Sequence, residues 1–237
     1  ISTGLVGSEM CIRDSAIHDD PYETYRRLRD EAPAYWNPDL SFWVLSRFED
    51  VQNAFKDFDT FSSTGGVALE SRRRRDAGRM EFQQMIEMDP PDHTSFRKLV
   101  NRIFTGRRVA AMEDDIRNIF NGYLDQIVER GEADLVEEVT SPFPMDVISA
   151  FLDIPEGDRA QLRSYSDTIL IREDGKMELP QVAAEGMFAM LQYFIDDLPK
   201  RRKNPRNGII DDLLTLEVDG RSLTEEELLG FCILFVI

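Results

Sequence analysis

Apolar residues recur at helical spacing along most of the chain after residue 89. This periodicity predicts helices at about 90–104, 108–130, 143–153, 156–171, 181–202 and 208–216. Glycine or proline interrupts the pattern between or beside these segments, at Gly106, Gly131, Pro155, Pro180 and Pro205. The larger part of the chain is therefore predicted to be α-helical.

The region before residue 60 has a different pattern. Asp20 and Pro21, followed by the acidic Glu23, are typical of the start of a helix, which Pro33 would end. Two short apolar runs, at 34–36 and 42–45, flank an Asn-Pro-Asp turn and indicate a β-hairpin. This hairpin is the small β portion of the expected fold.

A second helix is expected directly after the hairpin. Ser46 and Glu49 have the spacing of a capping box, in which each side chain satisfies the other residue's backbone N–H. Val51, Phe55 and Phe58 would then lie on the side of this helix that is buried. Between residues 57 and 88 no period persists, and so long a loop inside a domain is usually functional or disordered.

The last segment is the most apolar of the chain. Thr224 and Glu227 repeat the capping-box spacing, and residues 228–237 are apolar without interruption apart from Gly230. A helix that is apolar on all sides is expected to run through the interior of a larger protein. The run is only about half of the ~20 residues that would cross a bilayer, so no membrane insertion is expected. The fold class is mainly α with a small β portion.

The charge balance narrows the possible partners. The formal net charge is −17, which disfavours nucleic acid and anionic membrane. The two cysteines, Cys11 and Cys232, have no metal-ligand spacing, as is typical of a reducing, cytoplasmic environment. We expect Cys232, within an apolar helix, to be an inert buried thiol.

Residues 1–15 show neither helical nor strand periodicity, and they lack the pattern of a signal peptide. We expect them to be a non-native leader in which Cys11 has no role. The remainder, residues 16–237, is expected to form part of one domain.

The candidate chemistry lies at the start of the helix near residue 90. Asp89-Pro90-Pro91 prepares the chain for the first turn, and His93 and Arg97, four residues apart, share one face. Together with the free N–H groups of the helix start, they would suit a carboxylate or phosphate group. A solvated helix end with a chance histidine explains this spacing equally well.

Five blocks of sequence occur in a fixed order: residues 43–51 with 61–63, the Asp-Pro-Pro-x-His-x-x-x-Arg stretch at 89–97, residues 104–109, residues 208–214, and Gly220 with 223–228. Together and in this order, they resemble the corresponding blocks of bacterial cytochromes P450. One departure is Gly106, which stands where the family usually has proline. Glycine also permits a turn there.

The resemblance implies a truncated cytochrome P450 fold that ends inside the family's long central helix. It implies that His93 and Arg97 hold the propionates of haem b in a monooxygenase that hydroxylates a hydrophobic small molecule. Such an enzyme uses O2 and electrons from a ferredoxin-type or flavin reductase, and its axial cysteine thiolate favours O–O cleavage. The acid–alcohol pair and the cysteine ligand would lie beyond Ile237, so no catalytic residue is expected here and the chain alone should be inactive.

The resemblance also places apolar pocket positions at Ile86, Met88, Leu234 and Ile237. The basic stretch at residues 69–108 holds ten Lys and Arg against six Asp and Glu. Its four arginines at 72–75 either belong to a solvated loop or, with Arg102, Arg107 and Arg108, contribute to a docking face for an acidic ferredoxin. An alternative function of another class is a stand-alone helical binding or interaction module with an anion site at His93 and Arg97.

Overall fold

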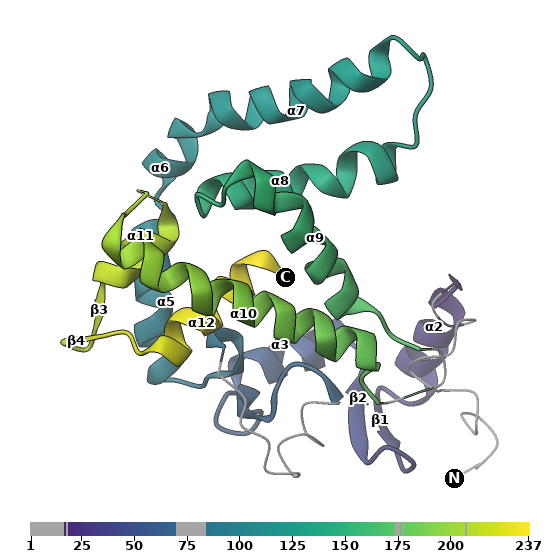
Figure 1. Ribbon diagram of the computed structural model, residues 1–237. Coiled ribbons are helices and arrows are strands. Elements are labelled where there is room, and N and C mark those ends of the chain that lie inside the picture. The colour runs from purple at the N-terminus through teal and green to yellow at the C-terminus, as the bar shows by residue number, and fades with distance from the viewer. Residues whose placement is uncertain (1–16, 18, 70–83, 174–175, 177, 207) are drawn as a thin grey trace.

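The structure is a computed structural model that describes residues 17, 19–69, 84–173, 176, 178–206 and 208–237 (Figure 1). The described chain is mainly helical with two short hairpins, which confirms the predicted fold class. The helices are α2 (Tyr22–Glu31), α3 (Phe48–Lys56), η1 (Ser63–Gly65), η2 (Met85–Glu87), α5 (Asp92–Ile103), α6 (Gly106–Ala111), α7 (Glu113–Val128), the π-helical η3 (Val136–Thr140), α8 (Pro142–Phe151), α9 (Glu156–Leu170), α10 (Gln181–Lys203), α11 (Ile209–Thr215) and α12 (Glu225–Val236). The strands are β1 (Ala34–Asn37), β2 (Phe42–Leu45), β3 (Glu217–Val218) and β4 (Arg221–Ser222). The predicted leader lies outside the described residues.

The predicted helices occur close to their expected bounds, but one helix is divided and one hairpin was not expected. The segment at 108–130 is divided into α6 and α7, because the backbone N–H of Met112 bonds to Val109 in a tight turn (3.1 Å). The hairpin formed by β3 and β4 was not predicted, since each strand has only two residues. Short strands of this kind leave no period to detect.

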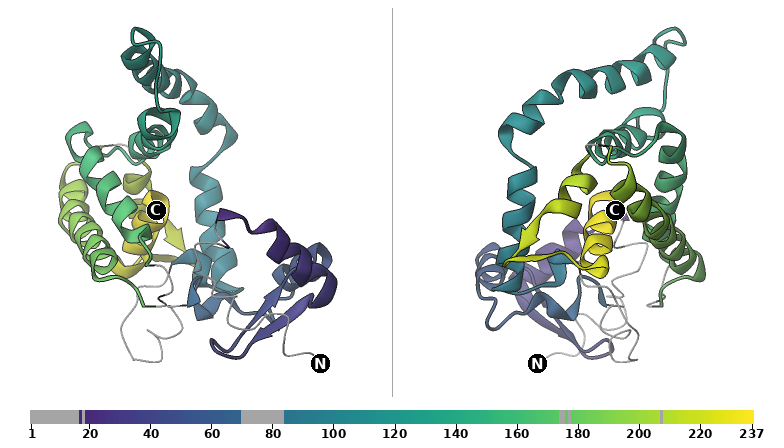
Figure 2. Two further views of the ribbon diagram at one scale, coloured as in Figure 1. Left: turned by 90° about the vertical axis from the view of Figure 1, so that its right-hand side faces the viewer. Right: turned by 60° about the vertical axis from the view of Figure 1, so that its left-hand side comes forward.

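The first hairpin is antiparallel, as predicted, and places Trp36 opposite Trp43 with ring centroids 5.3 Å apart. Its turn is held by Asn37, whose side-chain oxygen accepts the backbone N–H groups of Asp39 (3.1 Å) and Leu40 (3.0 Å). Figure 2 shows α2, this hairpin and α3 together on one side of the helical body.

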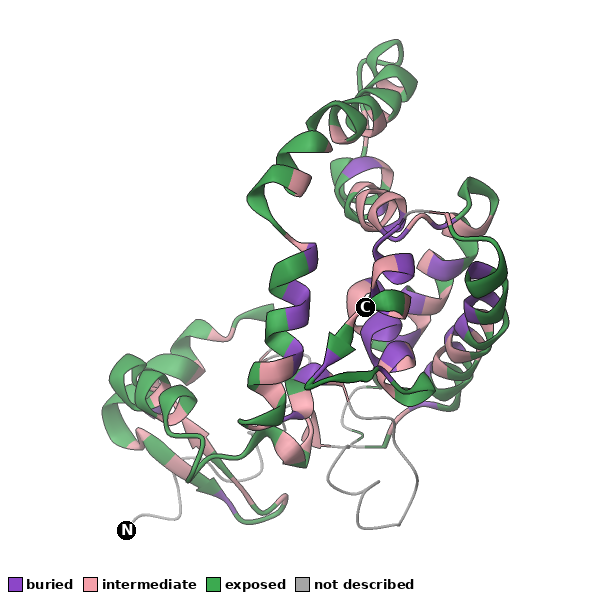
Figure 3. Cartoon of the chain, turned by 90° about the vertical axis from the view of Figure 1, so that its left-hand side faces the viewer, coloured by how far each residue is buried: buried purple, intermediate pink, exposed green. Residues whose placement is uncertain are grey.

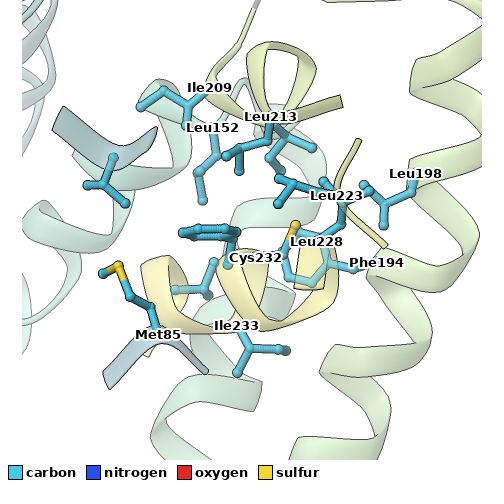
Figure 4. Packing of buried hydrophobic residues seen from close by; sticks show 14 of the residues in the cluster. Met85, Leu152, Phe194, Leu198, Ile209, Leu213, Leu223, Leu228, Cys232 and Ile233 are labelled. Atoms are coloured by element: carbon cyan, nitrogen blue, oxygen red, sulfur yellow. The ribbon is translucent and has the colours of Figure 1, made fainter. Parts of the chain in front are cut away.

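The core is built around α12. Its N-terminus has the predicted capping box: the Thr224 hydroxyl accepts from the Glu227 N–H (3.2 Å), and the Glu227 carboxylate accepts from the Thr224 N–H (2.8 Å). The helix contacts α8, α9, α10, α11 and η2. Buried residues concentrate on α12 and on the faces turned toward it (Figure 3), and Figure 4 shows Cys232 and Ile233 among side chains from several of these helices.

The prediction for α3 is wrong in two respects. Arg47, not Ser46, precedes the helix, and the Ser46 hydroxyl donates to the Pro33 carbonyl (3.3 Å) instead of capping. Phe55 and Phe58 are 85% and 47% exposed, because α3 has no extensive contact with another described element. The apolar period identified the helix but not its environment.

A buried ion cluster joins the end of α10 to the start of α11. Arg201, fully buried, pairs with Asp197 (2.5 Å) and Asp211 (3.3 Å) and donates to the backbone oxygen of Asp153 (3.0 Å). A side chain at Gly208 would come within 2.6 Å of the Asp153 Cβ, so this close approach requires glycine. The buried charges of the cluster are paired with one another, although Asp211 Oδ1 has no hydrogen-bond partner in the described part of the chain. No helix in the described ranges is long and apolar enough to cross a bilayer.

Candidate functional site

The first turn of α5 carries the candidate anion site. The backbone N–H of His93 donates to the Asp89 carbonyl (3.0 Å), and Pro91 occupies the capping position. The buried face of α5 is formed by Phe96, Leu99, Val100 and Ile103. Phe96 stacks on Phe231 of α12 with ring centroids 5.6 Å apart, which fixes the rotation of α5 against the core.

His93 and Arg97 lie beside this buried face, about 40° apart around the helix axis. His93 is partly buried and Arg97 is exposed. Within the described part of the chain, neither side chain has a hydrogen bond or an ion pair, although the charge of His93 acts on Asp89. The structure thus places both side chains on one edge of α5.

The sequence did not reveal which groups the side-chain oxygens of Asp89 bind. Asp89 Oδ2 accepts the Ser62 hydroxyl (2.5 Å), and Oδ1 accepts the Ser63 backbone N–H (2.8 Å). The Ser62 hydrogen bond, then the Ser63 N–H and the charge of His93, hold the pKa of the Asp89 carboxyl below its usual range. The only sequence signal was the Asp-Pro-Pro pattern, which does not reveal a partner 27 residues away.

The predicted pocket positions fall into two groups. Met88 is buried in the core, and Leu234 of α12 packs against that core. Ile86 and Ile237 are 40% and 43% exposed. The structure brings η2 and α12 into contact, so the segments that carry these residues are neighbours. Their role in a substrate pocket stays a prediction.

Cys232 is a fully buried free thiol, in agreement with the expectation from sequence. Burial is the main cause that raises its pKa to about 12, with Asp197 adding to the rise and Arg201 opposing it. The thiol therefore stays protonated and inert near neutral pH.

The basic stretch is only partly within the described ranges. Arg108 forms an ion pair with Asp212 of α11, while Arg102 and Arg107 are exposed. The four arginines at 72–75 lie outside the described residues. Among the residues that can be described, no group of three His, Cys, Asp or Glu side chains is arranged to hold a metal ion.

No protein-family model matches the chain, but individual relatives do. A putative cytochrome P450 123 of Mycobacterium bovis is 38% identical over 225 residues, which are 94% of this chain and 56% of that protein. A steroid C26-monooxygenase of Rhodococcus jostii is 30% identical over 230 residues, 92% of this chain and 48% of its own length. Among solved structures, CYP109E1 from Bacillus megaterium in complex with testosterone superposes with a TM-score of 0.78 at 27% identity.

The chain belongs to the cytochrome P450 family. That solved structure matches 92% of this chain and 56% of its own length, and the chain spans about half the length of the relatives it matches. This share is consistent with the N-terminal half of a cytochrome P450. Cytochromes P450 carry haem, so the donor set on α5 can be compared with the groups that a haem presents.

Proposed function

We propose that this chain forms part of a haem-thiolate monooxygenase and that His93 and Arg97 hold the haem propionates. The observation that carries this proposal is a pair of donor side chains, without protein partners in the described residues, on one edge of α5. A propionate is a carboxylate, and a guanidinium and an imidazole N–H are suitable donors for it. The chemistry of the donor set therefore fits the group.

When bound, haem supplies the oxygen chemistry, and the protein binds and orients it. His93 and Arg97 act on the propionate edge only. Arg97, on an exposed surface, can offer two parallel N–H donors, whereas His93 offers one from a more buried position. Because Phe96 and Phe231 fix the rotation of α5, both donors have a defined direction relative to α12.

We further propose that the axial cysteine belongs to the half of the family's length that this chain does not span. Cys232 is unsuited to the role, because its thiol is fully buried and protonated. The 237 residues mixed with haem should therefore give no thiolate-type absorbance in a reduced carbon-monoxide spectrum. Appearance of that band from this chain alone would contradict the proposal.

The whole enzyme is proposed to hydroxylate a hydrophobic small molecule, using O2 and electrons from a ferredoxin-type or flavin reductase. The apolar candidates Ile86, Met88, Leu234 and Ile237 support a hydrophobic substrate, since two neighbouring segments supply them. The relatives named for a steroid reaction and for a testosterone complex support the same class.

The propionate role can be tested in the holoenzyme by measuring haem transfer to apomyoglobin. We expect His93→Ala and Arg97→Ala each to speed haem release about tenfold, because each removes a charge-assisted hydrogen bond. Arg102→Ala is the matched control, since Arg102 lies on the same helix about 180° from His93. If all three variants release haem at the wild-type rate, His93 and Arg97 do not hold the propionates, and an unrelated anion site becomes the better explanation.

A further inference from the structure

The turn around η1 has no apolar anchor. None of residues 57–69 is buried. The hydrogen bonds within this stretch are local: Thr60 and Phe61 donate to Asp57, and Gly66 donates to Ser63. Local bonds shape a turn but do not attach it to the rest of the protein.

Asp89 supplies the attachment. In the described part of the chain, its bonds to the Ser62 hydroxyl and the Ser63 N–H are the long-range hydrogen bonds of residues 57–69. The Ser62 hydroxyl also accepts the Thr64 N–H (3.2 Å), so one serine both caps η1 and reaches Asp89. The lowered pKa of Asp89 keeps its carboxylate ionised, which makes both bonds charge-assisted.

Asp89 is also connected to the candidate site, through its main chain. The Asp89 carbonyl accepts the backbone N–H of His93, so its main chain belongs to the first turn of α5. On its other side, Met85 and Met88 anchor η2 in the core. Asp89 therefore lies between a well-anchored core segment and His93, and in the described part of the chain its side chain supplies the long-range hydrogen bonds of the turn.

We propose that Asp89 is a positioning residue that ties the turn at residues 62–65 to the start of α5 and thereby holds His93 in place for the anionic group. The second half of this statement rests on the proposed function, because it assumes that His93 holds a haem propionate. The first half does not depend on haem.

Two measurements in the holoenzyme test the tie and its consequence. Amide hydrogen exchange at Ser63 and Thr64 should accelerate about tenfold in Asp89→Ala, and less in Asp89→Asn and Ser62→Ala, which each keep part of the contact. Haem release should accelerate about threefold to tenfold in Asp89→Ala. Asp57→Ala is the matched control, because among the described residues the Asp57 side chain accepts only the local N–H of Thr60.

A double-mutant cycle separates positioning from a general structural effect. If Asp89 acts through His93, adding Asp89→Ala to His93→Ala should cause little further haem release. Strict additivity of the two effects, or unchanged exchange at Ser63 in Asp89→Ala, would overturn the proposal. If His93→Ala alone leaves haem release unchanged, the propionate role fails, while the exchange data still decide whether Asp89 ties the turn.

Discussion

Helices α12 and α3 begin with the same sequence signal, but α12 is buried in the core and α3 has no buried residue. Thr224 and Glu227 close a capping box, and the helix that follows is the centre of the core. Ser46 and Glu49 have the same spacing, yet no box forms and α3 has no buried residue. A capping pattern therefore predicts where a helix starts more reliably than how its first turn is satisfied.

The difference comes from the neighbouring hairpins. Beside α12, Arg221 of β4 donates to both carboxylate oxygens of Glu227 (2.6 and 2.8 Å), so the hairpin holds the glutamate in its capping position. Beside α3, the Ser46 hydroxyl is engaged by the Pro33 carbonyl across the base of the first hairpin. In one case tertiary contacts support the local motif, and in the other they compete with it.

Burial should dominate the energetic difference between the two helices. Phe231→Ala in α12 is expected to lower the free energy of unfolding by about 3–5 kcal/mol, because it leaves a cavity between Phe96 and Phe235. Phe55→Ala in α3 should change it by about 0.5 kcal/mol or less, since that ring is already exposed. Urea unfolding followed by circular dichroism measures both. Equal losses would show that α3 is packed in solution.

Removing the hydroxyl at the start of each helix should give a smaller difference in the free energy of unfolding. Thr224→Ala is expected to cost about 1 kcal/mol, the usual effect of removing an N-cap side chain. Ser46→Ala should cost about half of that or less, because the backbone N–H of Ser46 still donates to Pro33 (3.1 Å). The same urea titrations apply. A larger loss for Ser46→Ala than for Thr224→Ala would reverse our explanation of the two motifs.

Local sequence signals predicted most of the fold. The helix expected at 181–202 is α10, and the hairpin around the Asn-Pro-Asp turn has the expected strands. These elements follow from the apolar period and from the turn residues. Both signals come from residues that are close together in the sequence. Gly106 is a further case: it is the first residue of α6, a position that also suits the proline usual in the family.

Contacts between distant segments could not be predicted in the same way. The exposure of Phe55 depends on what covers α3, and the ion cluster of Arg201 joins α10 to α11 through residues whose spacing carries no signal. For the candidate site, the spacing of His93 and Arg97 predicted their shared edge. The Asp89 bonds to Ser62 and Ser63 became visible only when the chain was folded.

The smallest expected effect is on the free energy of unfolding and its change at acid pH. The Arg221 hydrogen bond, assisted by the Thr224 N–H and the charge of Arg221, lowers the pKa of Glu227 from its ordinary value of 4.5. A carboxylate with a lowered folded pKa stabilises the fold at pH values above 4.5, and this contribution disappears as the pH falls through the folded value.

Glu227→Gln should therefore destabilise the chain at pH 7 by less than about 1 kcal/mol, since the pair is partly solvated. The difference from wild type should shrink as the pH falls below about 4.5, where Glu227 takes up its proton first in the unfolded chain and, at lower pH, in the folded protein. Urea midpoints between pH 3 and pH 7 measure this, with Glu49→Gln as the control because α3 has no capping box. A pH-independent difference for Glu227→Gln would mean that the ionisation of Glu227 contributes nothing to that difference. The contrast between the two helix starts would then rest on Thr224 alone.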